Sequence, residues 1–375
     1  MFSMTIGVLK EPAFETRVSL LPEHIKSLVK QQVNVQIERS AGERSFAADD
    51  QYESEGGLID SRNNILQSAD IILSIHPLSE EDIAACKGKV LLGFYQPLYH
   101  PSYTKALSEK GFTVFSIDML PRTTRAQSMD VLSSQANIAG YKAVLLAANL
   151  YPKYFPMFMT AAGSIPPAKI LILGAGVAGL QAIATAKRLG AVVEVFDTRP
   201  AVKEEVMSLG AKFVEVEGAA DAAKAGGYAV EQSEEFMAKQ KARIAESVAK
   251  SDIIITTAQI PGKKAPILIT GDMVKSMKNG SVIIDIAAAT GGNTPFTKNN
   301  QTVHVNGVSI VGNSALSSDM PSDASKLYGK NMINFLQLII NKEGDLNLNF
   351  DDDLVKGTCV AHGGKITNDR IGNLQ

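Results

Sequence analysis

A glycine-rich turn followed by one carboxylate is the clearest chemical signature in this sequence. The turn, Gly174-Ala175-Gly176-Val177-Ala178-Gly179, has the spacing GxGxxG. In such a turn the first glycine permits a sharp change of direction, the second lets a pyrophosphate approach the backbone, and the third lets a helix pack close to the sheet. The N–H groups of Val177 and Ala178 lie at the predicted start of that helix, where they would attract phosphate.

The carboxylate is Asp197, about 20 residues after the turn, where an acid accepts hydrogen bonds from an adenosine ribose. Its charge would repel the 2′-phosphate of NADP, so this residue favours NAD(H). Thr198 and Arg199 follow directly. Arg199 argues for the opposite preference, because a nearby arginine can accommodate that phosphate.

The elements around the turn have the order that dinucleotide binding requires. Residues 169–173 form an apolar, partly β-branched run that suits a strand buried on both faces. Apolar residues then recur at helical spacing over residues 180–189, and Gly190 ends the predicted helix. A second strand over 192–196 stops at Asp197. We therefore predict a dinucleotide-binding domain rather than an ordinary glycine-rich turn.

Composition excludes several other classes of protein. The 375-residue chain is 45% hydrophobic with a net charge of −2, so no strong field draws it to nucleic acid or anionic lipid. No apolar run approaches the roughly 18 residues that span a bilayer, and the charged Lys10 follows too soon for residues 1–9 to be a signal peptide. Cys86 and Cys359 suit packing positions in a reducing cytoplasm. The five scattered histidines show no metal-ligand spacing, so we expect no metal site.

The residues before the glycine turn predict a second α/β unit. Helical segments alternate there with apolar strands expected at 5–9, 33–38, 70–75, 89–94 and 112–117. The fold class is therefore α/β, with two Rossmann-like, doubly wound parallel-sheet domains joined by long helices. We expect residues 1–127 plus 322–375 to form an N-terminal α/β domain, and residues 128–321 to form the NAD(H)-binding Rossmann domain.

A polar segment over residues 120–130 leads into the predicted linking helix, 128–148, for which Ser128 is a candidate N-cap. One face of this helix carries Asp130, Ser134, Asn137 and Tyr141. That face is either solvated or directed into a cleft between the domains. Residues 321–340 predict a further helix that returns to the first domain.

Two later segments are candidates for ligand contact. Gln259 follows a predicted strand at 251–257, at the carboxyl end where open α/β sheets bind ligands. Residues 218–233 are rich in alanine and glycine near their start and predict a mobile loop. Such a loop is either a plain connection or a lid.

Several segments resemble the NAD(H)-binding component, the α1-type subunit or domain I, of proton-translocating NAD(P) transhydrogenase. The resemblance covers nearly the whole chain, and it is carried by RTTRAQSMDVLSSQANIAGY at 122–141, MTAAGSIPP at 159–167, LILGAGVAGLQAIATAKRLG at 171–190, and residues 260–268 and 280–292. The loop 122–130 is its most specific segment. The family is shared with alanine dehydrogenase.

The resemblance implies two Rossmann-like domains around a cleft, a homodimer, and NAD(H) bound on the fingerprint domain. The implied partners are an NADP(H)-binding domain, or β subunit, and a membrane subunit that conducts protons. Hydride would pass directly between the two nicotinamides. The chain would then be cytoplasmic and peripheral on the inner face of the cytoplasmic membrane through these partners.

The resemblance also assigns roles to individual residues. Arg122, Gln127 and Asp130 would position the nicotinamide, Gln127 through the carboxamide and the other two as a charged pair. The same loop and the helix start contribute Thr123, Thr124, Arg125 and Ser133. The adenosine side would be held by Val177, Asp197, Thr198 and Arg199, and the closing loop would include Gly227 and Tyr228. Hydride transfer between nicotinamides ionises no substrate group, so these residues need only orient the ring and exclude water.

The nearest alternative is an alanine dehydrogenase-like amino-acid oxidoreductase; saccharopine dehydrogenase is more distant. That chemistry uses an arginine, a lysine, a histidine and an aspartate. Arg17 matches the arginine, but Ser74, Tyr95 or Gln96, and Ala289 stand where the other three would fall. His76 and His100 lie nearby as possible substitutes.

A non-enzymatic alternative is an NAD(H)-sensing subunit that regulates a partner without transferring hydride. The glycine turn is compatible with it, whereas the loop 122–130 argues against it. The chain also departs from the transhydrogenase pattern. Ala289 replaces an acid, Gln232 replaces a methionine, and Asp319 replaces an arginine. These departures bear on loop closure or partner docking rather than on NAD(H) binding.

Overall fold

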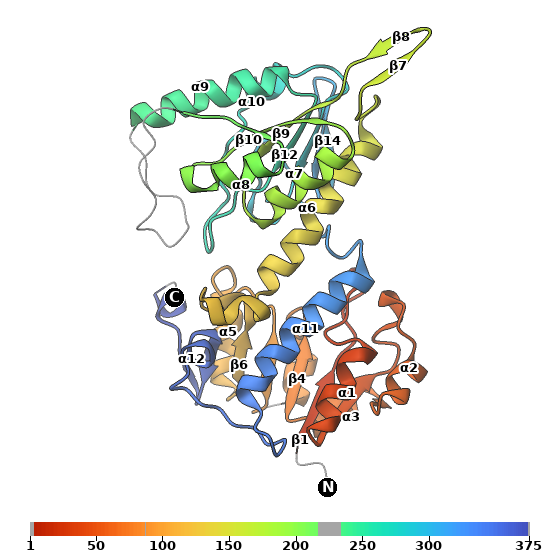
Figure 1. Ribbon diagram of the computed structural model, residues 1–375. Helices are drawn as coiled ribbons and strands as arrows, with labels where there is room; N and C mark the ends of the chain where they lie inside the picture. The colour runs from red at the N-terminus through yellow and green to blue at the C-terminus, as the bar shows by residue number, and fades with distance from the viewer. Residues whose placement is uncertain (1–3, 87, 217–233, 374–375) are drawn as a thin grey trace. The chain divides into compact units, whose positions relative to one another are not determined.

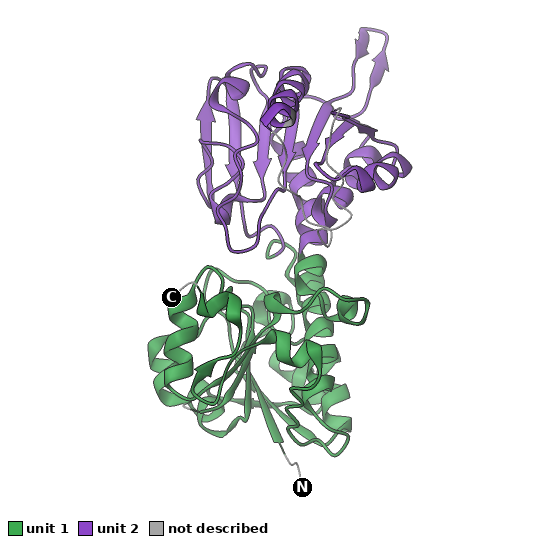
Figure 2. Cartoon of the chain, turned by 90° about the vertical axis from the view of Figure 1, so that its left-hand side faces the viewer, with its two compact units in different colours: residues 1–135, 318–375 green, residues 136–317 purple. Residues whose placement is uncertain are grey.

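The computed structural model describes residues 4–86, 88–216 and 234–373. The chain divides into two compact units (Figure 2). Unit 1 comprises residues 1–135 and 318–375, and unit 2 comprises residues 136–317. Each unit is a largely parallel sheet with helices on both faces, so the predicted α/β fold class is confirmed. The domain boundaries expected after residues 127 and 321 stay a prediction.

Unit 1 contains an eight-stranded sheet of order β17-β16-β6-β5-β4-β1-β2-β3. Its strands are β1 (Met4–Val8), β2 (Val33–Glu38), β3 (Leu58–Asp60), β4 (Ile71–Ser74), β5 (Val90–Gly93), β6 (Thr113–Ser116), β16 (Cys359–His362) and β17 (Lys365–Ile366). Strands β1 to β6 are parallel, whereas β16 is antiparallel to β6. Because β1 pairs with both β2 and β4, the direction of strand addition reverses between β1 and β4. The short β3 and the C-terminal β16 and β17 were not predicted.

Helices cover both faces of this sheet (Figure 1). One apolar core holds side chains of α1 (Pro22–Lys30), α11 (Pro321–Ile339) and α12 (Asp353–Thr358), and the other holds those of α3 (Arg62–Ser68), α4 (Glu80–Ala85), α5 (Pro101–Glu109) and α13 (Asp369–Gly372). Phe335 of α11 packs on Phe115 of β6 with ring centroids 5.5 Å apart. The remaining short elements are α2 (Asp49–Ser54), η1 (Glu43–Ser45), η2 (Ile117–Met119) and η3 (Thr124–Met129).

Unit 2 contains a seven-stranded sheet of order β11-β10-β9-β12-β13-β15-β14. Its strands are β9 (Lys169–Leu173), β10 (Val192–Phe196), β11 (Lys212–Phe213), β12 (Ile253–Thr256), β13 (Val282–Asp285), β14 (Gln301–Val305) and β15 (Val308–Gly312). All pairs are parallel except β14 with β15. The order reverses between β9 and β12, and ligands of open α/β sheets bind at such a switch point.

Two apolar cores again lie on the two faces. One contains side chains of α6 (Val131–Leu150), α7 (Val177–Arg188) and α8 (Lys203–Ser208), and the other contains those of α9 (Glu234–Lys250) and α10 (Gly271–Lys275). The short elements η4 (Pro200–Val202) and η5 (Ala288–Thr290) complete the unit. Among the helices of the described residues, none combines the length and the apolar character needed to cross a membrane.

The long helix α6 begins later than the sequence suggested. It spans Val131–Leu150, not 128–148, and Ser128 lies in η3 instead of capping the helix. Ala126 and Met129 are buried, which holds η3 against the core of unit 1. The Asp130 carboxylate then accepts hydrogen bonds from the Ser133 N–H (3.0 Å) and hydroxyl (2.6 Å), so Asp130 occupies the capping position.

A β-hairpin of β7 (Phe158–Thr160) and β8 (Gly163–Ile165), which was not predicted, lies between α6 and β9. Figure 1 shows it extending away from the sheet of unit 2. Its apolar side chains are exposed, Met159 to 75%. The four prolines between residues 151 and 168 concealed this pairing, because proline is rare within strands.

The contact of α6 with the start of α7 allows a test of the packing. A Cβ on Gly140 would collide with the carbonyl oxygen of Ala178. Gly140→Ala should therefore destabilise the protein by about 1–3 kcal/mol in urea unfolding, although alanine normally favours a helix by about 1 kcal/mol. Gly372→Ala is the control, because a Cβ there meets no described atom within 4 Å. A stabilised Gly140→Ala variant would contradict this packing.

Candidate functional site

The glycine turn follows β9 at the switch point of unit 2. Gly174 has φ +105°, and a Cβ there would collide with the Thr257 hydroxyl. A Cβ on Gly179 would collide with the carbonyl oxygen of Gly174, so the third glycine does let α7 approach β9. These two glycines are explained by the protein itself.

Gly176 differs from both. It has an ordinary φ of −79°, and a Cβ built on it meets no atom of the described residues within 4 Å. Neither backbone strain nor a protein neighbour therefore requires glycine at this position. The open space lies directly beside the first turn of α7, whose N–H groups have no carbonyl acceptors within the helix. This arrangement fits a group with phosphate oxygens that approaches the backbone closely.

Asp197 follows β10 beside the turn and is already engaged. Its Oδ2 accepts a hydrogen bond from the Ala175 N–H (2.7 Å), which ties the end of β10 to the glycine turn. Its Oδ1 accepts from the main-chain N–H (2.8 Å) and Nε (2.9 Å) of Arg199, and the Arg199 Nη2 lies 2.8 Å from Oδ2. The hydrogen bond to Asp197 raises the pKa of the Arg199 guanidinium. The guanidinium thus faces the carboxylate that a ribose would use.

The third side of the switch point is the segment after β12. The Thr257 hydroxyl donates to the carbonyl oxygens of Leu173 and Gly174, at 3.3 and 3.2 Å. Gln259 is exposed, and its Nε2 donates to the carbonyl oxygen of Ile286 (3.3 Å). Unit 2 therefore brings together, at the carboxyl ends of β9, β10 and β12, the predicted residues Gly174, Gly176, Val177, Ala178, Gly179, Asp197, Thr198, Arg199 and Gln259. Gly227, Tyr228 and Gln232 lie outside the described residues.

The predicted nicotinamide loop belongs to unit 1. Its polar side chains are exposed, namely Arg122, Thr123, Thr124, Arg125 and Gln127. Helix α11 anchors the loop, because Asn331 and Asn334 both donate Nδ2 hydrogen bonds to the carbonyl oxygen of Ser128, at 2.8 and 2.9 Å. Asn331 also accepts a hydrogen bond from the Ser134 hydroxyl (2.7 Å), so it joins η3 to α6. The polar face of α6 is thus partly engaged, and Asn137 likewise donates to Gln181 in unit 2.

Two members of this loop have partners that the sequence did not suggest. Both oxygens of Asp130 accept hydrogen bonds from Ser133 at the helix start. Arg125 pairs with Asp352 (2.8 Å) and also with Asp353, at the beginning of α12. These contacts within the protein stabilise the conformation of the loop without a ligand.

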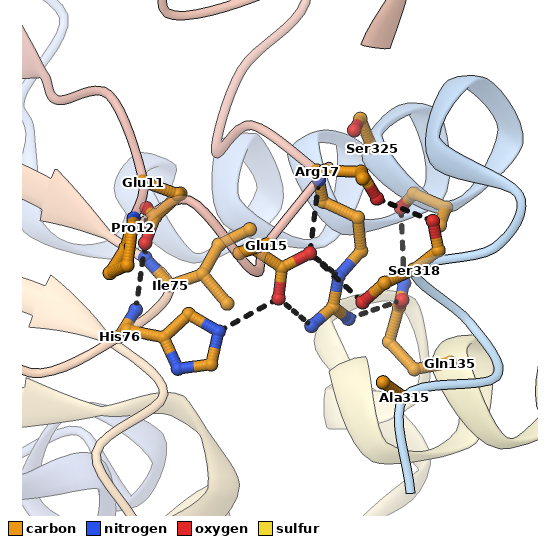
Figure 3. Close-up of polar contacts among 12 residues, drawn as sticks. Glu11, Pro12, Glu15, Arg17, Ile75, His76, Gln135, Ala315, Ser318 and Ser325 are labelled. Carbon is orange, nitrogen blue, oxygen red and sulfur yellow. Dashed lines mark hydrogen bonds and ion pairs between the residues drawn. The ribbon is translucent and has the colours of Figure 1, made fainter. Parts of the chain in front are cut away.

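The switch point of unit 1 carries a second polar cluster, which Figure 3 shows in detail. Glu15 is nearly fully buried. Its carboxylate accepts hydrogen bonds from the main-chain N–H (3.0 Å), Nε (2.8 Å) and Nη2 (2.7 Å) of Arg17, and it lies 2.7 Å from Nε2 of His76. Arg17 also donates to Gln135 in α6 (2.8 Å). Burial raises the pKa of Glu15, but Arg17 and His76 outweigh it and leave that pKa well below its usual range. The buried pair therefore joins the loop after β1 to β4 and α6.

Glu11 occupies the same switch point. Its carboxylate accepts hydrogen bonds from the main-chain N–H groups of Ile75 (2.6 Å) and His76 (3.1 Å), directly after β4. It is 5% exposed, and burial raises its pKa to about 7 despite these two donors.

The positions that an amino-acid dehydrogenase would use are filled differently here. The hydroxyls of Ser74 and Tyr95 are buried and hydrogen-bonded to each other (3.0 Å). Ala289 is exposed in η5, Asp319 is exposed before α11, and His100 precedes α5. Across residues 4–86, 88–216 and 234–373, no cluster of three or more histidine, cysteine or acidic side chains could hold a metal ion.

Comparison with known families gives a consistent answer over almost the entire length. Residues 7–139 match the alanine dehydrogenase/PNT N-terminal domain, and residues 143–369 match the alanine dehydrogenase/PNT C-terminal domain. The chain belongs to the alanine dehydrogenase/PNT family. Both halves of that family pattern are present, and the predicted membership is confirmed.

Within the alanine dehydrogenase/PNT family, similarity is greater to transhydrogenase. The chain is 45% identical over 372 residues to the first part of NAD(P) transhydrogenase subunit alpha of Rickettsia prowazekii, covering 97% of this chain and 96% of the relative. A crystal structure of transhydrogenase from Sinorhizobium meliloti superimposes with a TM-score of 0.89 at 43% identity, over 96% of this chain and 99% of that one. Alanine dehydrogenase of Bacillus subtilis is 29% identical over 294 residues, 77% of this chain and 72% of the relative.

The raised pKa of Glu11 predicts a pH-dependent stability. The unfolded carboxyl ionises near pH 4.5 and the folded one near pH 7, so the folded state holds the proton longer. The raised pKa of Glu11 therefore stabilises the folded state fully below pH 4.5, and this stabilisation is lost as the pH rises through 7. Urea unfolding of the wild type and Glu11→Gln should therefore show the wild type losing about 2–3 kcal/mol relative to the variant between pH 5 and 8. A constant difference would mean that Glu11 stays ionised throughout.

Proposed function

We propose that this chain is the NAD(H)-binding subunit of a proton-translocating transhydrogenase. The observation that carries the proposal is the open position at Gly176, beside the start of α7 and next to the Asp197 carboxylate. The similarity to the first part of NAD(P) transhydrogenase subunit alpha supports the type of reaction. The pyrophosphate of NAD(H) would lie over Gly176, Val177 and Ala178.

The adenosine half would lie over β10. Asp197 would accept hydrogen bonds from the ribose hydroxyls, with Thr198 beside it and Arg199 yielding or sharing its place on the carboxylate. The retained contact of Asp197 with the Ala175 N–H keeps the carboxylate oriented. The single carboxylate favours NADH, and Arg199 reduces that preference.

Orientation is the main task of the other residues. NADH supplies the hydride, which would pass directly to NADP⁺ held on a partner domain. Gln127 would hydrogen-bond the carboxamide of the nicotinamide, and Arg122 and Asp130 would fix the ring. Further contacts to NAD(H) would come from Thr123, Thr124, Arg125, Ser133 and Gln259. No general base is needed, because the transfer ionises no substrate group.

The proposed partners are an NADP(H)-binding domain and a membrane subunit that conducts protons, which would hold the chain at the inner face of the cytoplasmic membrane. We also propose a homodimer. The exposed apolar hairpin β7–β8 supports it, because a two-stranded hairpin is marginally stable alone and Met157 and Met159 are 61% and 75% exposed. Sedimentation as a monomer at micromolar concentration would contradict the dimer.

The deciding experiment mixes the purified chain with a transhydrogenase NADP(H)-binding domain and follows hydride transfer from NADH to bound NADP⁺. Oxidation of alanine with NAD⁺ is measured alongside. Rapid transfer without alanine oxidation supports the proposal. Alanine oxidation would mean that other groups, such as His76 or His100, replace the missing dehydrogenase residues. Tight NADH binding with neither reaction would favour a sensing subunit.

Gly176→Ala separates ligand binding from folding. Because a Cβ at this position meets no atom in the part of the chain that the structure describes, the free energy of unfolding should fall by no more than about 1 kcal/mol, the usual cost of alanine at an N-cap. The affinity for NADH, measured by titration of its fluorescence, should fall about tenfold or more because the methyl group occupies the pyrophosphate position. Gly372→Ala should change neither quantity. Unchanged NADH affinity would remove the pyrophosphate from this position.

Gln127→Ala separates orientation from binding. The variant should bind NADH nearly as tightly as the wild type, because the adenosine and pyrophosphate contacts lie elsewhere. Hydride transfer to the NADP(H)-binding domain should slow by about ten- to hundredfold, since a misplaced ring loses alignment. Ser128→Ala, which alters the neighbouring exposed side chain, is the control. Proportionate losses of binding and transfer would show that Gln127 serves binding only.

A further inference from the structure

One fully buried side chain, Asn293, joins the segments that follow β12 and β13. Its Oδ1 accepts a hydrogen bond from the Ala258 N–H (3.2 Å), and its Nδ2 donates to the carbonyl oxygens of Ala258 (2.9 Å) and Pro266 (2.8 Å). Its exposed fraction is 0%. The amide therefore holds both main-chain polar groups of Ala258 and reaches the far end of the same segment.

The main chain of Asn293 is itself fixed by hydrogen bonds. Its main-chain N–H donates to Oδ2 of Asp285 (2.6 Å), a carboxylate that is also fully buried at the end of β13. The same oxygen accepts from the Thr297 hydroxyl (2.6 Å), and Oδ1 accepts from the Ala287 N–H (3.0 Å). The carbonyl oxygen of Asn293 accepts from the N–H groups of Leu268 and Ile269. The side chain that holds Ala258 thus has little freedom to move.

The Asn293 amide lies on the side of the switch point where the nicotinamide half of a dinucleotide would bind. The dinucleotide of a doubly wound sheet lies across the switch point, here between β9 and β12. Asp197 at β10 marks the adenosine side, so the other half of the dinucleotide must lie toward β12. Ala258 and Gln259 follow β12 directly, and Thr257 binds the glycine turn from the same segment.

We propose that Asn293 is a positioning residue for the nicotinamide half of NAD(H). It acts through Ala258, because it fixes the main chain of Ala258 directly after β12, where the nicotinamide half would bind. Asn293 has no effect on the binding of the adenosine half at Asp197. The inference rests on the proposed function, because it requires a dinucleotide in this place. Asn293 is buried and lies away from the glycine turn, and it would affect the binding of the nicotinamide half only.

Asn293→Asp tests this assignment with little change of shape. The aspartate replaces two donated hydrogen bonds with oxygens that face the carbonyls of Ala258 and Pro266, so the segment after β12 should shift. We expect the affinity for NADH to fall about tenfold or more, while the affinity for 5′-AMP stays within about twofold. Equal losses for both ligands, or no loss for either, would overturn the proposal. Asn293→Ser is the second variant if the aspartate prevents folding.

A matched control and a measurement on the unaltered protein complete the test. Thr297→Val removes a hydrogen bond to Asp285 in the same loop without touching Ala258, so it should lower stability and leave the NADH to 5′-AMP affinity ratio unchanged. In the wild type, hydrogen exchange over residues 258–268 should slow with NADH and not with 5′-AMP. Equal protection by both ligands would contradict the role of Asn293. A wild type that binds neither ligand would instead contradict the proposed function.

Discussion

The close approach of α7 to β9 is the constraint on which the rest of unit 2 depends. Gly179 permits it, because any Cβ there would strike the carbonyl oxygen of Gly174. On the opposite side, Gly140 lets α6 approach the backbone of Ala178 just as closely. The first turn of α7 is thereby held between a strand and a long helix, beside the open space at Gly176. Packing therefore places helix N–H groups without intrahelical acceptors beside open space, an arrangement that suits an anion before any charged side chain is considered.

Buried or half-buried carboxylates stabilise the loops around this frame by one repeated device. Asp197 and Glu11 each follow a parallel strand and accept main-chain N–H groups from an adjacent loop. Asp285, at the end of β13, accepts main-chain N–H groups from the loop that follows the same strand. Each therefore fixes the carboxyl edge of its sheet, where ligands bind. An acid at such a position in the sequence has two explanations, a ligand contact and a loop contact, and for Asp197 the loop contact is the one that the structure shows.

Sequence reasoning succeeded where a pattern is local and repeated. The apolar runs at β9 and β12 are buried along nearly their whole length and were found from their composition. The start of α6 was misplaced because Asp130 caps through a contact with Ser133, while Ala126 and Met129 hold the preceding residues in η3. The strands β3, β16 and β17 are too short or too far from their neighbours in the chain to show a period. The role of Asn293 was equally hidden, because 35 residues separate it from Ala258 and only the pairing of β12 with β13 brings them together.

Five strands follow the same order in the two units, β3-β2-β1-β4-β5 in unit 1 and β11-β10-β9-β12-β13 in unit 2, and the sheets differ beyond them. The two switch points differ in the residues that surround them. Between β1 and β4, the loops are joined by the side chains of Glu11, Glu15, Arg17 and His76. Both carboxylate oxygens of Glu15 accept hydrogen bonds from the guanidinium of Arg17. Between β9 and β12, the corresponding place is bordered by Gly176, and a Cβ there would meet no atom among residues 4–86, 88–216 and 234–373. A parallel sheet directs loops to this point in either case. Whether the point receives a ligand or the chain's own side chains is decided by residue size and charge at a few positions after the strands, which is why topology alone predicts the location of a site but not its occupant.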